Sequence, residues 1–212
     1  MTDISVWLRD ALPRTPGASR AVVKREFRLT LREFFAQSYT WREIVYAMPL
    51  VAGQTDYLPV PADPVNSEVV AVLGVARNGT ALYPLPWAPA DYTQTGTPAY
   101  WHSPATIRPA VRVHPIPTVD TVAAGVTIDF EIVVMPSLVA DTVPDWVYTQ
   151  YYDGLFDGVL GRLYAHPAKA YSNTTAAAYH LNRFRTAIQQ ASGAAKQGHV
   201  VGQNWRFPRF GK

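Results

Sequence analysis

The sequence of 212 residues contains no cysteine, which excludes disulfide bonds, thiolate zinc sites, iron–sulfur clusters and cysteine nucleophiles. Charged residues are scarce, at 17% against roughly 25% in an average soluble domain. Long hydrophobic runs are also missing. None approaches the roughly 18 apolar residues of a membrane-spanning helix, and the N-terminus has no signal-peptide core. We therefore expect no membrane segment and a protein that works in the cytoplasm or in a particle assembled there.

Hydrophobic residues make up 48% of the chain, which is enough for a buried core and excludes a wholly disordered protein. At this length we expect one domain of ordinary size or two small ones. Together with the low charge, this composition indicates that partner chains cover part of the surface.

Charge and proline divide the chain into three segments. Residues 1–43 carry a net charge of +3, residues 44–157 carry −8, and residues 158–212 carry +8 with no Asp or Glu. Fourteen of the 18 prolines lie between residues 49 and 144. A proline-rich acidic middle is therefore flanked by two basic ends, and we expect the three segments to be built differently.

The N-terminal segment has the pattern of helices. A short helix over residues 4–12 is expected to end at Pro13, and Ser19 is a suitable N-cap for a second helix over residues 19–38. The apolar stripe of this second helix has helical spacing and consists of Val23, Phe27, Leu31, Phe34 and Phe35. The opposite face carries Lys24, Arg25, Arg28 and Arg32. That face is either a contact for a polyanion or an ordinary solvated helix face.

The middle segment, residues 41–135, has the pattern of β-structure. Apolar residues alternate in three stretches, and in the first of them one face is expected to hold Ile44, Tyr46, Met48 and Leu50. Asn78-Gly79 predicts a hairpin with a partner strand over residues 81–85, because a type I′ turn needs positive φ at both central positions. Asp129 and Glu131 are expected to face solvent. Short strands joined by proline and glycine turns predict an antiparallel sandwich or barrel.

The C-terminal segment returns to helices, which we expect over residues 144–165 and 175–195. The first of them carries Gly154, Gly158 and Gly161 along one line. Each glycine in a helix interior costs about 1 kcal/mol relative to alanine. We therefore expect another backbone to approach this line closely, within the chain or between subunits. The second helix has a coiled-coil-like apolar seam.

Residues 198–212 have no core periodicity, yet they are rich in aromatic and cationic side chains. Trp205, Phe207 and Phe210 alternate with Arg206 and Arg209. Trp and Arg are enriched at the hot spots of protein interfaces, and Phe is enriched at interfaces generally. We expect an extended tail that leaves the subunit body and docks on a partner protein.

The usual signatures of catalysis are missing from the sequence. It has no dinucleotide-binding fingerprint, Walker loop, nucleophile elbow or zinc-protease motif. The nearest pair of histidines, His102 and His114, fits surface or half-buried imidazoles better than a metal site. Asp153 and Asp157 lie one helical turn apart and could act as acid and base, but the glycines beside them favour a helix contact. We therefore expect no enzyme, no cofactor and no metal.

An ordered series of short motifs spans nearly the whole chain. It consists of Pro13 to Gly17, Phe34-Phe35, Gly53 to Pro59, Thr97 to Trp101, Val111 to Pro117, Val143 to Asp145, Tyr151 to Leu155 and Gly158 to Tyr164. This series resembles the head-to-tail adaptor family of tailed bacteriophages, and it is similar to the adaptor called tail tubular protein A in short-tailed phages.

Together with the residue patterns, the resemblance predicts an α+β fold. Residues 1–40 and 141–197 would form a helical bundle, residues 41–140 an inserted antiparallel β-sandwich or barrel domain, and residues 198–212 an extended docking tail. The resemblance implies a structural virion protein without catalysis. It implies a dodecameric ring docked under the portal vertex of a DNA-filled capsid, with a tail or nozzle protein below. Located in the neck of the virion, the ring would pass genomic DNA without binding it sequence-specifically.

Two other classes of function stay open on the sequence. The acid-free C-terminal segment could serve a nucleic-acid-binding module, since cations contact phosphates and aromatic rings stack on bases. A carbohydrate-binding β module could use Trp41, Trp87 and Trp101. Salt-dependent affinity for DNA would support the first alternative, and affinity for glycans would support the second.

Overall fold

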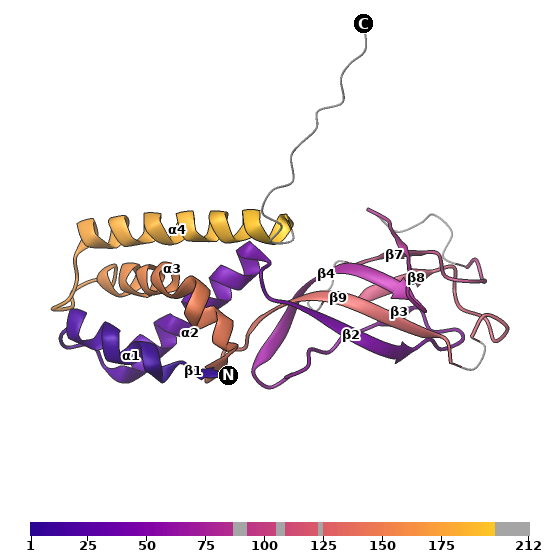
Figure 1. Cartoon of the computed structure of the whole chain (residues 1–212), viewed down its shortest axis with the longest axis horizontal. Helices are drawn as coiled ribbons and strands as arrows, with labels where there is room; N and C mark the ends of the chain where they lie inside the picture. The colour runs from indigo at the N-terminus through magenta and orange to yellow at the C-terminus, as the bar shows by residue number, and fades with distance from the viewer. Residues whose placement is uncertain (87–92, 105–108, 123–124, 198–212) are drawn as a thin grey trace, which may run out of the picture.

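The computed structural model describes residues 1–86, 93–104, 109–122 and 125–197. The molecule is elongated, with its helices gathered at one end and its main sheets at the other (Figure 1). The helices are α1 Ser5–Ala11, the 3₁₀ turn η1 Leu12–Arg14, α2 Arg20–Ser38, α3 Asp145–Tyr164 and α4 Thr174–Lys196. The three long helices begin and end within one residue of the ranges that the sequence predicts.

Local chemistry explains where the long helices begin and end. The Ser19 hydroxyl caps α2 by accepting a hydrogen bond at 3.3 Å from a backbone N–H three residues later. Tyr39 ends that helix in the left-handed conformation, with a φ of 56°. The Asn173 side chain caps α4 in the same way as Ser19 caps α2, at 3.0 Å. Asp145 in the first turn of α3 complements the positive helix end, and the N-terminal ammonium donates to it at 2.9 Å.

The helices bury a continuous apolar core. α3 lies along α4, and α2 contacts both of them. Solvent is excluded completely from the stripe predicted on α2, which is Val23, Phe27, Leu31, Phe34 and Phe35. The Phe34 ring lies 5.0 Å from the Tyr151 ring of α3 and 6.4 Å from the Phe184 ring of α4, measured between centroids. Burial of each large apolar side chain contributes about 1.5–3 kcal/mol, so α2 is held firmly by both neighbours.

Within the described residues, the β part contains two four-stranded sheets, with the orders β2-β9-β4-β5 and β3-β8-β7-β6. The strands are β2 Arg42–Pro49, β3 Asp56–Tyr57, β4 Ser67–Arg77, β5 Thr80–Ala81, β6 Tyr83–Pro84, β7 Tyr100–His102, β8 Val111–His114 and β9 Thr127–Pro136. The sheets contact each other through Tyr57 of β3 and Phe130 of β9, whose ring centroids are 6.4 Å apart. A separate pair, β1 Thr2–Asp3 and β10 Thr142–Val143, joins the N-terminus to the segment before α3.

The predicted turn at Asn78-Gly79 connects β4 to β5, and both residues have positive φ, at 45° and 77°. Its partner strand is shorter than the expected range of 81–85. After β5 the chain leaves the first sheet, and β6 pairs with β7 of the second sheet. That pair is parallel, whereas the sequence predicts only antiparallel neighbours. Parallel neighbours need a long connection, because the chain must return to the same end of the sheet. The segment between β6 and β7 is long enough for this, whereas a hairpin turn would make the pair antiparallel.

The alternation predicted for β2 is wrong. The sequence predicts that Ile44 and Tyr46 share a face with Met48, but these two residues are 52% and 70% exposed while Met48 packs against the core. A β-bulge between Val45 and Met48 shifts the register against β9, and Ala47 within it has a φ of 57°. A bulge adds one residue to a strand, so the side chains beyond it point to the opposite face from the one that strict alternation predicts. The sequence pattern alone does not reveal where such a residue is inserted.

Candidate functional site

Gly158 lies where α3 meets both α2 and α4. A Cβ on this residue would lie 2.5 Å from the Thr30 Cγ2 of α2 and 2.8 Å from the Phe184 ring of α4. Real Cβ atoms essentially never come that close to another heavy atom. Only glycine therefore fits at this position without displacing a neighbour, and the neighbours belong to the same chain.

Gly154 and Gly161 extend this contact along α3 in both directions. A Cβ on Gly154 would lie 2.5 Å from the Ala187 Cβ, and one on Gly161 would lie 2.8 Å from the Leu181 Cγ. The sequence predicts the approach of a backbone, whereas the nearest atoms are mostly side chains of α4. Close contact with these atoms adds dispersion energy, which offsets the roughly 1 kcal/mol that each glycine costs in a helix interior.

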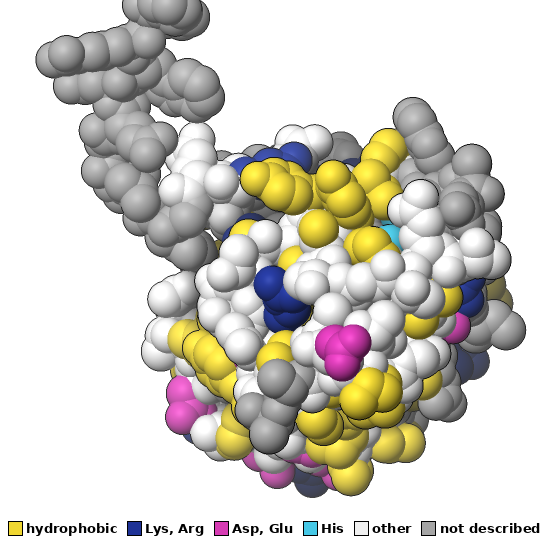
Figure 2. Space-filling model, turned by 90° about the vertical axis from the view of Figure 1, so that its right-hand side faces the viewer, with side chains coloured by type: hydrophobic (Ala, Val, Ile, Leu, Met, Phe, Trp, Pro, Cys, Tyr) yellow, Lys and Arg dark blue, Asp and Glu magenta, His cyan; other side chains and the backbone are white. Residues whose placement is uncertain are grey.

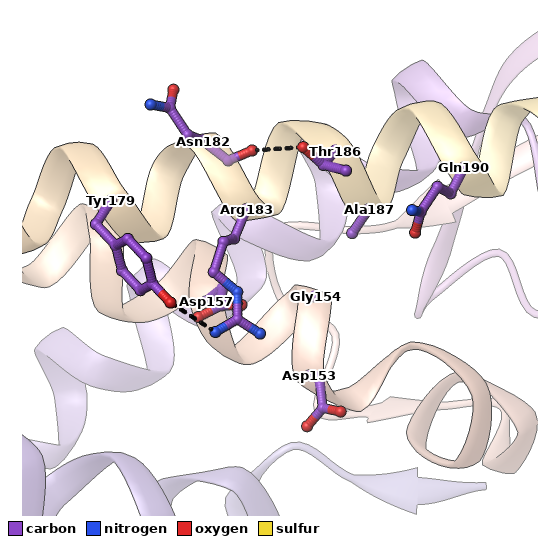
Figure 3. Close-up of a pocket in the computed structure, with 9 residues that line it drawn as sticks. All are labelled: Asp153, Gly154, Asp157, Tyr179, Asn182, Arg183, Thr186, Ala187 and Gln190. Atoms are coloured by element: carbon purple, nitrogen blue, oxygen red, sulfur yellow. Dashed lines mark hydrogen bonds and ion pairs between the residues drawn. The ribbon is translucent and has the colours of Figure 1, made fainter.

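Asp157 is the charged centre of the contact between α3 and α4 (Figure 3). Its buried carboxylate lies 2.7 Å from His180 Nδ1 and forms an ion pair with Arg183 Nε at 2.9 Å. Arg183 also donates to the Tyr179 hydroxyl at 3.2 Å, and this bond and the charge of Asp157 raise the pKa of the guanidinium. Asp153 is exposed and stands apart from the cluster. The structure does not bring the two carboxylates together as an acid–base pair.

A hollow of about 450 Å³ lies over this cluster, between α3 and α4. A second hollow of about 420 Å³ shares Asp153, Gly154, Ala187 and Gln190 with the first. Figure 3 shows small and polar side chains facing this space from both helices. The Thr186 hydroxyl is bonded to the backbone carbonyl of Asn182 at 3.1 Å. The Thr186 hydroxyl is therefore engaged within its own helix, and no histidine stands among the described residues of either lining to activate it.

Glu26 is a buried acid that no sequence pattern marks, apart from its place beside the apolar stripe of α2. Its side chain accepts two hydrogen bonds from Arg25, at 2.8 and 3.2 Å, and lies 3.4 Å from His166 Nε2. Arg162 of α3 approaches Glu26 at 4.0 Å and also pairs with Glu33 of α2. These contacts join α2 to α3 and to the loop after α3, so the cluster has a structural role.

The basic face of α2 is largely neutralised inside the chain. Lys24 and Arg28 both pair with Asp141, and Arg32 pairs with Glu68 at 3.1 Å. Hydrogen bonds from Lys24 and Arg28 hold the pKa of the Asp141 carboxyl below its ordinary value. These three cations are neither a free polyanion contact nor a solvated face. They fasten α2 to the acidic middle segment.

His102 and His114 form a buried pair on the neighbouring strands β7 and β8. Nδ1 of His102 lies 3.1 Å from Nε2 of His114, and the rings stack with their centroids 5.0 Å apart. Burial lowers the pKa of both imidazoles. They are more buried than the sequence indicates, at 5% and 6% exposure. Among the described residues, no group of three metal-ligating side chains could hold an ion.

Two of the three tryptophans considered for carbohydrate binding are core residues. Trp41 and Trp101 are only 7% and 6% exposed, and Trp87 lies outside the described residues. The docking residues predicted in the tail also lie outside them, namely Trp205, Arg206, Phe207, Arg209 and Phe210. The predicted glycine line thus lies in a contact with α2 and α4. The docking role of the tail stays a prediction from the sequence.

The features described above are packing and ion-pair contacts within the chain. Its glycine line packs helices, and its charged clusters connect helices to one another or to loops. In the part of the chain that the structure describes, none of these clusters pairs a nucleophile with a base. No helix in that part is long and apolar enough to cross a membrane.

The family model described as SU10 adaptor protein matches residues 1–205. The chain therefore belongs to the SU10 adaptor protein family, whose members are structural adaptor proteins of phages. Among curated proteins, none matches the chain. The family match confirms the prediction of a phage adaptor and supports the expectation of a structural protein over an enzyme.

Proposed function

We propose that the protein is a head-to-tail adaptor similar to tail tubular protein A. Twelve copies form a ring that docks on the portal vertex of the DNA-filled capsid, and a tail or nozzle protein attaches below. The ring lies in the neck of the virion, is assembled in the host cytoplasm, and lines part of the channel through which DNA is ejected. It requires no cofactor and does not enter a membrane.

The observation that carries this proposal is the match of an adaptor family over residues 1–205. The arrangement of the chain supports it, because the β part begins directly after α2 and ends before α3, and these two helices contact each other. We interpret the helices as a bundle and residues 41–140 as a β domain inserted into it. An elongated subunit of two parts can present one part to a portal and the other to a tail.

The distribution of charge supports ring formation. Residues 44–157 carry −8 and residues 158–212 carry +8. A contact between unlike surfaces of successive copies is heterologous, and such contacts close a ring when the rotation between copies fits. Lys24, Arg28 and Arg32 of α2 are occupied by acids of the same chain. In the C-terminal segment, Arg162 and Arg183 are also paired within the chain, so we assign the contact with a neighbouring copy to the other cations of that segment.

The acidic middle segment also supports the passage of DNA without specific binding. A channel wall with the same sign of charge as the phosphates repels the duplex and keeps it from adhering. A nucleic-acid-binding module would use the acid-free C-terminal segment, and it is less well supported because Arg162 and Arg183 of that segment are paired with acids of the same chain. A carbohydrate-binding module is also less well supported, because Trp41 and Trp101 are buried.

We further propose that residues 198–212 attach the adaptor to the portal. Trp205, Phe207 and Phe210 would fill apolar pockets, and Arg206 and Arg209 would pair with acids. The sequence alone supports this role. The segment directly follows α4, so it can reach beyond the body of the subunit.

Attachment to capsids tests the proposal. Portal-containing heads are mixed with the full chain or with a chain lacking residues 199–212, and bound protein is measured by co-sedimentation. The full chain is expected to bind, and the shortened chain to lose binding while it melts at nearly the same temperature. Arg185→Ala removes one exposed cation of α4 and is the matched control, expected to bind like the unchanged protein. Failure of the full chain to bind portal-containing heads would contradict the proposal.

A further inference from the structure

The outer face of the first sheet, which points away from the second sheet, carries exposed apolar side chains. Ile44 of β2 is directly paired with Glu131 of β9, so the two side chains share this face. Ile44 is 52% exposed, and Tyr46, two residues further along the strand, is 70% exposed. β2 is an edge strand of the sheet. Figure 2, which views the molecule from the end that holds the sheets, shows hydrophobic side chains at the surface of this end among few charged ones.

The three long strands differ in chemistry across this outer face. β9 contributes the carboxylates of Asp129 and Glu131 in the middle. On β4, the residues paired with these acids are Ala76 and Gly74, which have little or no side chain. A Cβ on Gly74 would have only the Glu131 side chain within 4 Å, at 3.6 Å from Oε2. The outer face is therefore apolar along β2 and acidic along β9. Along β4, at Gly74 and Ala76, small residues leave space above the sheet.

The last turn of α4 ends at this same face. Arg42 at the start of β2 donates to the backbone carbonyl of Ala195 at 2.9 Å, and its guanidinium also pairs with Glu131 at 3.3 Å. Figure 1 shows α4 ending beside the beginning of the β part. The described part of the chain therefore ends at Gln197, two residues after the contact between α4 and Arg42 of β2.

We propose that, in the free subunit, residues 198–212 dock along the outer face of the first sheet of their own chain. Fifteen extended residues span up to about 50 Å, whereas the eight residues of β2 span about 27 Å, so the segment is long enough. Its aromatic residues match the apolar side chains of β2. Its cations, Arg206, Arg209 and Lys212, match the carboxylates of β9. In an extended segment, Trp205 and Phe207 share one side with Arg209, so aromatic and cationic side chains can face the sheet together.

This inference goes beyond the proposed function, because it concerns the subunit before assembly. Docking on its own sheet covers the aromatic side chains of the segment and those of β2 until a partner is present. Binding to a portal then requires the segment to leave the sheet, so each contact excludes the other. The inference stands or fails on the isolated chain, whatever the protein binds in the virion.

Disulfide trapping tests the inference cleanly, because the chain contains no cysteine of its own. The test chain carries Tyr46→Cys and Phe207→Cys, and the control chain carries Gln189→Cys and Phe207→Cys. Tyr46 and Gln189 are both exposed. Tyr46 lies about 13 Å along β2 from Arg42, and Gln189 lies about 9 Å along α4 from Ala195, the residue that Arg42 contacts. If residues 198–212 do not dock, the cysteine at position 207 should therefore reach the cysteines at positions 46 and 189 about equally often.

We expect the test chain to form a bond within one molecule at least about tenfold faster than the control chain under mild oxidation of dilute protein. High salt is expected to slow the test chain selectively, since it screens cations from Asp129 and Glu131. A second test chain with Ile44→Cys in place of Tyr46→Cys guards against a local effect of one substitution. Equal rates in test and control chains, or bonds formed only between two molecules, would overturn the inference.

Discussion

Arg42 donates from Nη2 to the backbone carbonyl of Ala195 at 2.9 Å, which joins the first strand of the β part to the last turn of α4. The same guanidinium donates to the Tyr39 carbonyl after α2 and to Glu131 of β9. A cation at this position also complements the partial negative charge at a helix C-terminus. One side chain therefore connects two helices to the first sheet, alongside the packing of α2 against β9 and the pair between Arg32 and Glu68.

Replacing Arg42 should loosen this connection. Arg42→Met keeps much of the apolar stem and removes the donors, so we expect the free energy of unfolding to fall by about 1–2 kcal/mol. Hydrogen exchange in the last turn of α4 should become faster. Urea unfolding and hydrogen exchange measure the two effects, and Arg185→Met on the exposed side of α4 is the control. An Arg42→Met protein with the stability and exchange of the control would show that the contact is unimportant.

Replacing a glycine by alanine should have opposite effects on stability in α3 and in α4. Gly158→Ala forces a Cβ against Thr30 and Phe184, so we expect a loss of about 1–3 kcal/mol in the free energy of unfolding, and a larger loss for Gly158→Leu. Gly193 of α4 has open space around it, so Gly193→Ala should gain up to about 1 kcal/mol from helix propensity. Thermal and urea unfolding measure the stability of each variant against that of the unchanged chain. If Gly158→Ala melts at the same temperature as the unchanged chain, the close-contact account of α3 is wrong.

Asp153 and Asp157 of α3 should respond differently to loss of charge. Asp157→Asn weakens the contacts with His180 and Arg183 at a buried position, so we expect a loss of about 1–3 kcal/mol. Asp153→Asn changes an exposed side chain of the same helix and should alter stability by less than about 0.5 kcal/mol. Urea unfolding of the two variants measures the difference. Equal effects would contradict the role given to Asp157.

The buried histidine pair predicts a dependence of stability on pH. Because burial lowers the pKa of His102 and His114, the folded chain binds fewer protons than the unfolded chain, in which histidine has a pKa of about 6.5. The free energy of unfolding should therefore fall as the pH drops below about 6.5. Asp56, whose pKa the hydrogen bond from Arg112 lowers, loses its contribution only below about pH 3.9, outside this window.

Comparison with His114→Gln isolates this effect from other titrating groups. Urea unfolding at about pH 7.5 and about pH 5.5 is expected to show a smaller decrease in stability for the variant than for the unchanged chain. The same decrease in both proteins would show that the pair is not responsible.

Most of the helical part and some of the β part could be predicted from the sequence, because the signals are local. The cap at Ser19, the stripe around Phe27 and the turn at Asn78-Gly79 each depend on a few neighbouring residues. In β9, Ile128 and Phe130 are fully buried, in agreement with the predicted alternation. The bulge in β2 and the parallel pairing of β6 with β7 were not predictable, because they depend on which strands meet in space.

The same limit applies to the candidate site. The glycine line was visible because three glycines at helical spacing need a compensating contact, but the identity of Thr30 and Phe184 as neighbours depends on the tertiary fold. The cations of α2 look free in the sequence because their partners are distant in the chain. Asp141, which pairs with Arg28, lies 113 residues away from it.

The mass of a complex with a purified portal ring tests the central claim most directly. Mass photometry of the portal ring alone and after addition of this protein gives the number of chains bound. The account predicts one complex, heavier than the portal ring by about twelve times the 23.5 kDa of the chain, with no effect of added DNA. An unchanged portal mass, or binding of variable numbers of chains without a defined ring, would contradict the assignment of this protein as a head-to-tail adaptor.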